Sequence, residues 1–191
     1  ALVCAADKAV RVFTIADGTP VTELEGHIYG VTGCYHTSDS KYIISASIDK
    51  TVRLWDGAEF SQKDDLNSHS ERITCLDINP EGTMVTTGSL DQTVRTWDVA
   101  AGSQVRKYQG HTEKVHDVKF TLDGLHVLSG GEDGLLFKWG VASGMADAIF
   151  RHHEAEEEGK RRVVSNIVAA TETEFVSIDR RTEIFIGKIA D

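Results

Sequence analysis

The sequence repeats with a period of 42 residues, and this repetition limits the possible folds more than any other feature. The three tryptophans, Trp55, Trp97 and Trp139, follow one another at this spacing. The same step separates histidines, aspartates and small hydroxyl residues, namely His27, His69, His111 and His153; Asp7, Asp49, Asp91 and Asp133; and Ser45, Thr87 and Ser129. Several residue types do not share one spacing through composition alone. The period therefore predicts an array of equivalent units packed side by side.

Each unit has the pattern of short strands. In the copy around Trp97, an apolar segment from Ile73 to Ile78 ends at the turn-like residues 79–82. Two β-branched runs follow at 83–87 and 93–97, and another turn lies between them. Such runs between Asx, Gly and Pro turns are typical of hairpins, and no window carries a sustained helical period. We therefore expect an all-β chain in which each unit supplies about four antiparallel strands, the size of one propeller blade.

Composition excludes several other classes of protein. Of the 191 residues, 40% are hydrophobic and 26% are charged, which is enough apolar material for a packed core. The formal net charge of -10 disfavours a uniformly basic nucleic-acid binder, and no apolar run reaches the roughly 18 residues of a membrane span. Three cysteines (Cys4, Cys34 and Cys75) without CxxC spacing favour a reducing compartment. We expect an intracellular protein, cytoplasmic by default, with nucleus and cilium left open.

Three stretches resemble the WD-repeat family of β-propellers. They run from Gly26-His27 to Trp55-Asp56, from Ser68-His69 to Trp97-Asp98, and from Gly110-His111 to Trp139-Gly140, with Ser68 and Gly140 departing from the family pattern. The resemblance covers nearly the whole chain. It implies WD repeats at 21–57, 63–99 and 105–141, a partial repeat at 1–17, and a divergent repeat at 148–188 with a charged insertion at 154–162. Phe13 and Phe185 are expected in the Trp position of the partial and divergent repeats.

The expected fold class is therefore an all-β fragment of a WD-repeat propeller, with four-stranded antiparallel blades in an incomplete ring over residues 1–191. Dividing the chain by the repeat length leaves fewer units than the seven blades that the family most often has. We expect the native polypeptide to continue on both sides and close the ring. The alternative is that a partner chain covers the open strand edges, which are otherwise prone to aggregation.

The recurring polar residues have two interpretations. Ser45, His27 and Asp49 are the ingredients of a nucleophilic triad. The same set recurs in two further units, however, and no reaction needs three equivalent triads. The resemblance implies instead a structural network in which the Trp N–H contacts the hydroxyl, the hydroxyl contacts His, and His contacts Asp. The expected tetrads are His27, Ser45, Asp49 and Trp55; His69, Thr87, Asp91 and Trp97; and His111, Ser129, Asp133 and Trp139.

We expect no catalytic residues, cofactor or metal. The repeated histidines fall one to a unit, and the adjacent His152 and His153 point to opposite sides of a strand. The sequence has no phosphate-binding loop, nucleotide fingerprint or HExxH motif. The charged run at 154–162 is interpreted as a solvated loop, with a docking segment as the alternative.

Repeat register indicates a candidate partner-binding face. Its positions flank the start of each opening strand or precede the tetrad Asp: Tyr29, Gly30, Thr32 and Ile48; Arg72, Thr74 and Leu90; and Lys114, His116 and Glu132. Arg72 and Lys114 are equivalent residues of adjacent units, so together they predict a basic spot suited to an acidic or phosphorylated peptide. Solvated loop tips are the alternative at each position.

These features predict a non-enzymatic protein-interaction scaffold that is one subunit of a larger intracellular assembly. Its partners are expected to be proteins or peptides, with no small-molecule substrate and no direct contact to nucleic acid. Two alternatives remain open: a substrate-recognition subunit of a ubiquitin ligase, and a propeller joined to an enzymatic domain outside these residues. The Trp-Asp-x-Arg ending that resembles an adaptor-docking motif is missing after Trp55 and Trp97, which weakens the first alternative.

Overall fold

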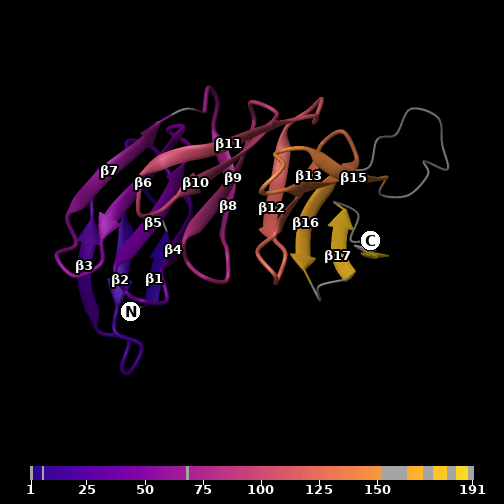
Figure 1. The fold of residues 1–191 in the computed structure, drawn as a ribbon. Coiled ribbons are helices and arrows are strands. Elements are labelled where there is room, and N and C mark those ends of the chain that lie inside the picture. Colours follow the sequence, from indigo (N-terminus) through magenta and orange to yellow (C-terminus); the bar gives the residue numbers. More distant parts are fainter. Residues whose placement is uncertain are drawn as a thin grey trace.

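The computed structural model describes residues 2–5, 7–67, 69–151, 163–169, 174–179 and 184–188. These residues form 18 β-strands and no helix, and the strands assemble into five antiparallel sheets. The prediction of an all-β chain is confirmed. Figure 1 shows the sheets following one another from the indigo N-terminal end to the yellow C-terminal end, and the described strands do not close a ring. His153 and the charged run at 154–162 lie outside the described residues.

Each sheet, called a blade here, contains consecutive strands in sequence order. Blade 1 has β1 (Leu2–Ala5), β2 (Val10–Phe13) and β3 (Pro20–Leu24). Blade 2 has β4 (Val31–His36), β5 (Tyr42–Ser47), β6 (Thr51–Asp56) and β7 (Gln62–Asn67). Blade 3 has β8 (Ile73–Ile78), β9 (Met84–Ser89), β10 (Thr93–Asp98) and β11 (Ser103–Gln109). Blade 4 has β12 (Val115–Phe120), β13 (His126–Gly131), β14 (Leu135–Gly140) and β15 (Ala146–Arg151). Blade 5 has β16 (Val164–Ala169), β17 (Glu174–Asp179) and β18 (Ile184–Lys188).

Turn chemistry sets the boundary between the first two strands of a blade. In blade 3, the side-chain oxygen of Asn79 accepts a hydrogen bond of 2.9 Å from the main-chain N–H of Thr83, which closes the turn. Gly82 and its equivalent Gly124 take φ angles of 73° and 69°, in the left-handed region that glycine enters without steric cost. Ser40 takes the same conformation in blade 2 with φ of 62°. The repeat therefore keeps this turn geometry even where glycine is missing.

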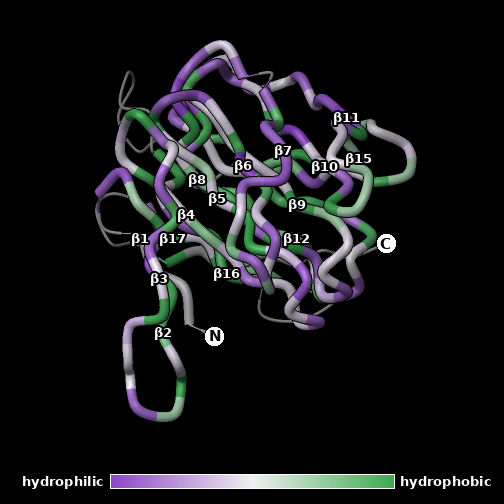
Figure 2. The backbone as a smooth tube through the Cα atoms, turned by 90° about the vertical axis from the view of Figure 1, so that its left-hand side faces the viewer, coloured by the Kyte–Doolittle hydropathy of each residue, from purple (hydrophilic) through white to green (hydrophobic). Residues whose placement is uncertain are grey.

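The hydrophobic core lies between neighbouring blades. The side chains of Ile44, Ala46, Val52 and Leu54 of blade 2 pack with Ile73, Leu76 and Trp97 of blade 3. Blades 1 and 2, blades 3 and 4, and blades 4 and 5 share equivalent clusters. Because an inner blade has a neighbour on each side, both faces of its strands are buried, and apolar residues follow one another along these strands. The fourth strands β7 and β11 are mostly exposed, and Figure 2 shows them in largely hydrophilic colours.

The register of blade 1 agrees with the repeat. Phe13 faces Pro20 across a bulge between β2 and β3, as Trp55 faces Gln62 across a bulge between β6 and β7. The expectation that Phe13 occupies the Trp position is therefore confirmed.

The register of blade 5 shows that Phe185 does not occupy the Trp position of the repeat, contrary to expectation. Ser177 faces Ile167 as Ser45 faces Cys34, so Ser177 is the equivalent of the tetrad hydroxyl residue. Phe185 then faces Ser177, which is the position of Arg53 in blade 2, and Gly187 stands where Trp55 stands. The sequence-based placement of Phe185 was wrong because spacing within the divergent repeat does not reveal which residues pair across the hairpin. Blade 5 consequently lacks the indole that blades 2, 3 and 4 carry at this position.

Candidate interaction site

Blade 2 shows the repeated polar residues as one continuous chain of hydrogen bonds. The indole Nε1–H of Trp55 donates to Ser45 Oγ at 2.9 Å, and Ser45 Oγ lies 2.8 Å from His27 Nε2. The other ring nitrogen of His27, Nδ1, lies 2.9 Å from Asp49 Oδ2. Asp49 also accepts the main-chain N–H of Ile28 at 3.0 Å. The chain of bonds therefore ties β6, β5 and the loop before β4 together.

Blades 3 and 4 repeat this geometry within a few tenths of an ångström. Trp97 donates to Thr87 at 3.0 Å, and Trp139 donates to Ser129 at 2.8 Å. His69 and His111 each lie 2.8 Å from the hydroxyl and 2.9 Å from the carboxylate, which belongs to Asp91 or Asp133. The structure thus brings all twelve expected tetrad residues together in three separate groups.

The protonation of the network follows from its partners. A carboxylate only accepts, so Nδ1 of each histidine carries the proton, and Nε2 of the neutral ring accepts from the hydroxyl. Burial lowers the pKa of His27 and of His69, and outweighs the opposite effect of the facing aspartates. Burial by itself would raise the pKa of Asp49, but hydrogen bonds from Thr51 and His27 outweigh it and hold that pKa below its usual value. A neutral imidazole beside an ionised carboxylate satisfies every donor in the chain.

The three hydroxyls are poorly placed for nucleophilic chemistry. Ser45, Thr87 and Ser129 have no exposed surface, and each hydroxyl already has an indole on one side and an imidazole on the other. A substrate therefore has no path to the oxygen in this structure. The network holds loops to sheets, because unpaired polar groups at these buried positions would each cost about 1–3 kcal/mol.

The candidate partner-binding residues lie at the blade end that carries the His-Asp loops. The main-chain N–H groups of Ile48, Leu90 and Glu132 donate to the carbonyls of Gly30, Arg72 and Lys114 at 2.9, 2.9 and 2.8 Å. These equal contacts place the three pairs at the same point of adjacent blades. Tyr29, Arg72 and Lys114 are exposed, whereas the other candidates, including His116, are partly buried.

Two threonines of this set are engaged within the fold. Thr32 Oγ1 donates to the carbonyl of Ala46 at 3.2 Å. Thr74 Oγ1 donates to the carbonyl of Gly88 at 3.0 Å and to that of Val115, in the next blade, at 2.7 Å. Their hydroxyls are therefore committed to strand and blade contacts.

The charges at this end are mixed. Lys114 Nζ lies 3.3 Å from Glu132 Oε2, and Lys50 Nζ lies 3.4 Å from Glu71 Oε1. Lys114, Lys50 and Glu71 are substantially exposed and the Glu132 side chain is 28% exposed, and pairs of this kind contribute little to stability because water and salt screen them. The basic groups can therefore exchange these partners for a ligand at small cost.

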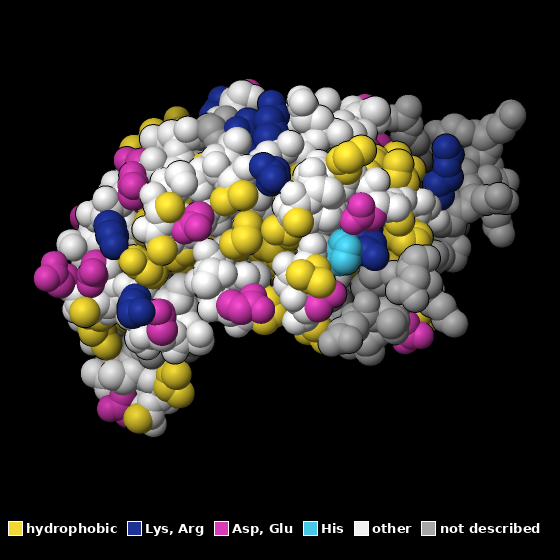
Figure 3. Space-filling model, in the orientation of Figure 1, with side chains coloured by type: hydrophobic (Ala, Val, Ile, Leu, Met, Phe, Trp, Pro, Cys, Tyr) yellow, Lys and Arg dark blue, Asp and Glu magenta, His cyan; other side chains and the backbone are white. Residues whose placement is uncertain are grey.

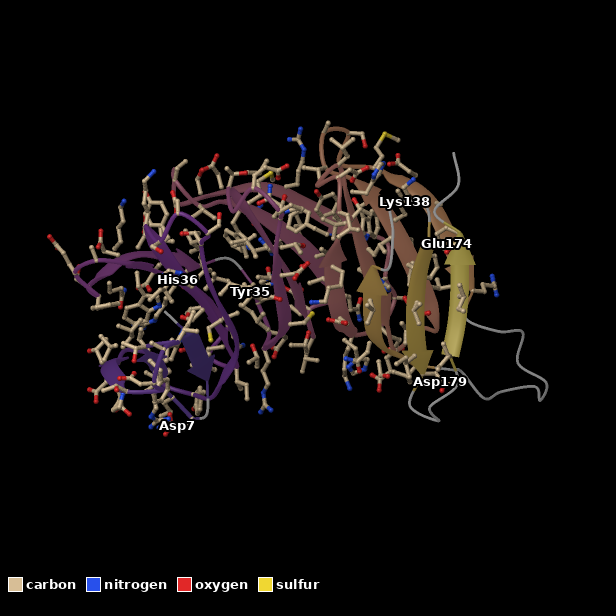
Figure 4. All side chains as sticks on the ribbon, turned by 90° about the horizontal axis from the view of Figure 1, so that it is seen from below. Asp7, Tyr35, His36, Lys138, Glu174 and Asp179 are labelled. Atoms are coloured by element: carbon tan, nitrogen blue, oxygen red, sulfur yellow. The ribbon has the colours of Figure 1, made fainter. Side chains whose placement is uncertain are left out.

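Sequence reasoning missed a polar ladder between first strands. Tyr35 projects from β4 toward β8 and donates to Asp77 Oδ1 at 2.9 Å (Figure 4). Lys119 Nζ of β12 donates to the same oxygen at 3.2 Å, and the N–H of Phe120 donates to Asp77 Oδ2 at 2.8 Å. Burial by itself would lower the pKa of Lys119, but Asp77 and neighbouring groups outweigh it and raise that pKa. Residues 35, 77 and 119 share the 42-residue step, so the signal was present, but three unlike residue types concealed it.

Asp117 extends these interblade contacts to blade 5. Its Oδ2 accepts the N–H of Ile167 at 2.7 Å, and burial raises its pKa. The equivalent residue in blade 3, Cys75, is buried, and burial raises the pKa of its thiol to about 12. A thiol that stays protonated is a weak nucleophile, so Cys75 acts here as a buried packing residue.

The described ranges also bear on metal binding and membrane insertion. Among these residues, no group of three or more His, Cys, Asp or Glu side chains is arranged to hold a metal ion. Over the same part of the chain, no helix has the length and apolar character needed to cross a membrane.

The stacked four-stranded blades and their repeated Trp-hydroxyl-His-Asp network define a protein of the WD-repeat propeller class. The family model described as "WD domain, G-beta repeat" matches residues 18–56, 60–98 and 102–140. The chain belongs to this WD40 family. A search among curated proteins gave no match. Domains of the WD40 family are in general non-catalytic scaffolds that bind other proteins.

Proposed function

We propose that this chain is a non-catalytic scaffold that joins partner proteins into a multi-protein assembly, and that partners bind across the end carrying the His-Asp loops. The proposal is supported by the three buried networks, which stabilise neighbouring loops in equivalent positions. Binding energy then comes from several blades at once, with one or two side chains from each. A rigid set of loops loses little conformational entropy on binding, which favours affinity.

The observation that carries this proposal is the equivalence of Arg72 and Lys114. Both are exposed, and their carbonyls accept matching hydrogen bonds in adjacent blades. We propose that they bind the carboxylates or phosphate of an acidic or phosphorylated segment. Arg72 suits planar recognition through paired hydrogen bonds, whereas Lys114 acts as a point charge. The ligand would replace Glu132 as the partner of Lys114.

Charge reversal at these two positions tests the proposal. Arg72→Glu with Lys114→Glu should remove acidic or phosphorylated partners in affinity purification of the intact protein, and should weaken their binding at least about tenfold. Lys107→Glu is the control, because Lys107 is also exposed but lies on the fourth strand of blade 3. An unchanged set of partners in the double variant would refute the assignment of this face.

A further inference from the structure

Blade 4 differs from its neighbours at the end opposite to the His-Asp loops. The turns after β12 and β14 lie at this end, and they carry Leu122, Leu125 and Met145. The three side chains are 55%, 63% and 69% exposed. We call them the blade 4 apolar patch. Exposed single apolar residues are common, but a group of three large ones at adjoining turns is a feature that calls for a reason.

The sister blades provide an internal comparison. At the three equivalent positions blade 2 has Ser38, Lys41 and Ser61, and blade 3 has Pro80, Thr83 and Ser103, all of them exposed. The same backbone turns therefore form without leucine or methionine. Folding does not require the apolar side chains of blade 4, so their presence points to a contact outside the chain.

Two hollows flank the turn that carries Leu122 and Leu125. The first has a volume of about 430 Å³ and is bounded by Leu122, Pro80 and Val168. The second, of about 410 Å³, is bounded by Leu125, Val141 and His126. A hydrogen bond of 2.9 Å from the N–H of Val141 to the carbonyl of Leu125 joins the two turns. Each hollow has the size of a pocket for one or two apolar side chains.

Charged groups around the patch carry an excess of negative charge. Lys119 is paired with Asp77 at 3.2 Å, and His126 Nε2 lies 3.4 Å from Asp147. Further carboxylates come from Glu81, beside Gly124, and from Asp123, with Lys138 near enough to lower the pKa of Asp123. Four carboxylates therefore stand against three cations, Lys119, Lys138 and Arg106, the last of which donates to the carbonyl of Ala142 at 3.1 Å. Figure 3 shows acidic side chains beside hydrophobic ones over this part of the molecule.

We propose that the blade 4 apolar patch binds a segment of a partner protein that presents two apolar side chains flanked by Lys or Arg. The apolar side chains enter the two hollows on either side of the turn, and the basic flanks face the carboxylates. This site lies at the opposite end of the blade from Arg72 and Lys114, so it is independent of the function proposed above.

Substitution by sister residues gives a variant that the fold tolerates. Leu122→Ser, Leu125→Thr and Met145→Ser place residues of blades 2 and 3 at the same turns, and thermal unfolding checks that the variant folds. The probes are fluorescein-labelled 12-residue peptides with two leucines separated by two to four residues and flanked by lysines, measured by fluorescence anisotropy with the intact protein. Val21→Ser with Val105→Ser is the control, because both residues are exposed valines on other blades, Val21 on β3 of blade 1 and Val105 on β11 of blade 3.

We expect saturable binding of a lysine-flanked peptide at one leucine spacing or more. The patch variant should bind at least about tenfold more weakly and the control within about twofold of the wild type. Equal binding by the patch variant, or no binding of any lysine-flanked peptide to the wild type, would overturn the site. Equal binding of peptides with glutamate flanks would overturn the charge assignment. Self-association abolished by the patch variant in sedimentation would make a second copy of this chain the occupant instead. If the triple variant does not fold, Leu125→Thr alone is compared in the same way.

Discussion

Tyr35 and Asp77 lie 42 positions apart in the sequence and are joined by a hydrogen bond of 2.9 Å across the boundary between blades 2 and 3. They occupy the same position in successive repeats, so the bond links one unit to its next copy. Lys119, one further repeat along, shares the same carboxylate oxygen. The ladder therefore couples three blades through residues that differ in each repeat.

Removing the Tyr35 hydroxyl should weaken the contact between blades 2 and 3. Tyr35→Phe keeps the ring but leaves Asp77, which is almost fully buried, with one donor fewer. We expect a loss of ~1–2 kcal/mol in the free energy of unfolding, measured by urea denaturation. Tyr29→Phe removes an exposed hydroxyl and should change stability by much less. Equal effects of the two substitutions would contradict the role of the ladder.

Trp97→Phe tests the buried network in the most deeply packed of the three tryptophan positions. The substitution removes the donor to Thr87 and leaves a cavity among the residues of blades 2 and 3. We expect a loss of about 2–4 kcal/mol by chemical denaturation, with partner contacts on other blades retained. Combining it with Thr87→Val should cost less than the sum of the two single changes, since both disrupt one hydrogen bond. Additive losses would argue against the network.

Acid should destabilise the protein in two stages. Burial lowers the pKa of His27 and His69 in the folded state below the ordinary 6.5, so the unfolded chain binds protons first. The stabilisation that the neutral histidines contribute is fully present above pH 6.5. It is lost as the pH drops from there toward the folded-state pKa. The lowered pKa values of Asp49, Asp91 and Asp133 add a second loss below their ordinary 3.8.

Thermal unfolding between about pH 8 and pH 3 measures both stages. A double variant, His27→Gln and His69→Gln, should be less stable than the wild type above pH 7 and should show a flatter profile through the first stage. A wild-type melting temperature that stays constant down to pH 4 would be incompatible with buried neutral histidines.

Replacing Gly130 by a larger residue should destabilise the protein. A Cβ added there would lie 2.3 Å from Cγ1 and 2.8 Å from Cβ of Val164, in the interface between blades 4 and 5. Gly130→Ala should therefore lower the free energy of unfolding by about 1–3 kcal/mol through overpacking. The equivalent position in blade 2 is already Ala46, which is buried in the core. Combining Gly130→Ala with Val164→Ala should recover part of the loss if the clash is the cause.

Much of the blade architecture could be predicted because it is local. The strands of blade 3 fall within a residue or two of the runs at 73–78, 83–87 and 93–97, since turn residues and β-branched segments are adjacent in the chain. Phe185 shows the limit of that reasoning. Its position depends on which residue faces Ser177 across a hairpin, and this pairing differs from the one expected from a count of residues.

The sequence alone determined the repeat length, the strand content and the residues of the three networks, because three successive repeats carry the same residue types at the same positions. Only the tertiary structure decided which side chains meet between blades, such as Tyr35, Asp77 and Lys119, and that hollows flank Leu122 and Leu125. These contacts join positions tens of residues apart whose residue types change from copy to copy. The physical reason is that a sequence period reveals only the residue types that the units have in common. Contacts between units depend on how neighbouring sheets pack.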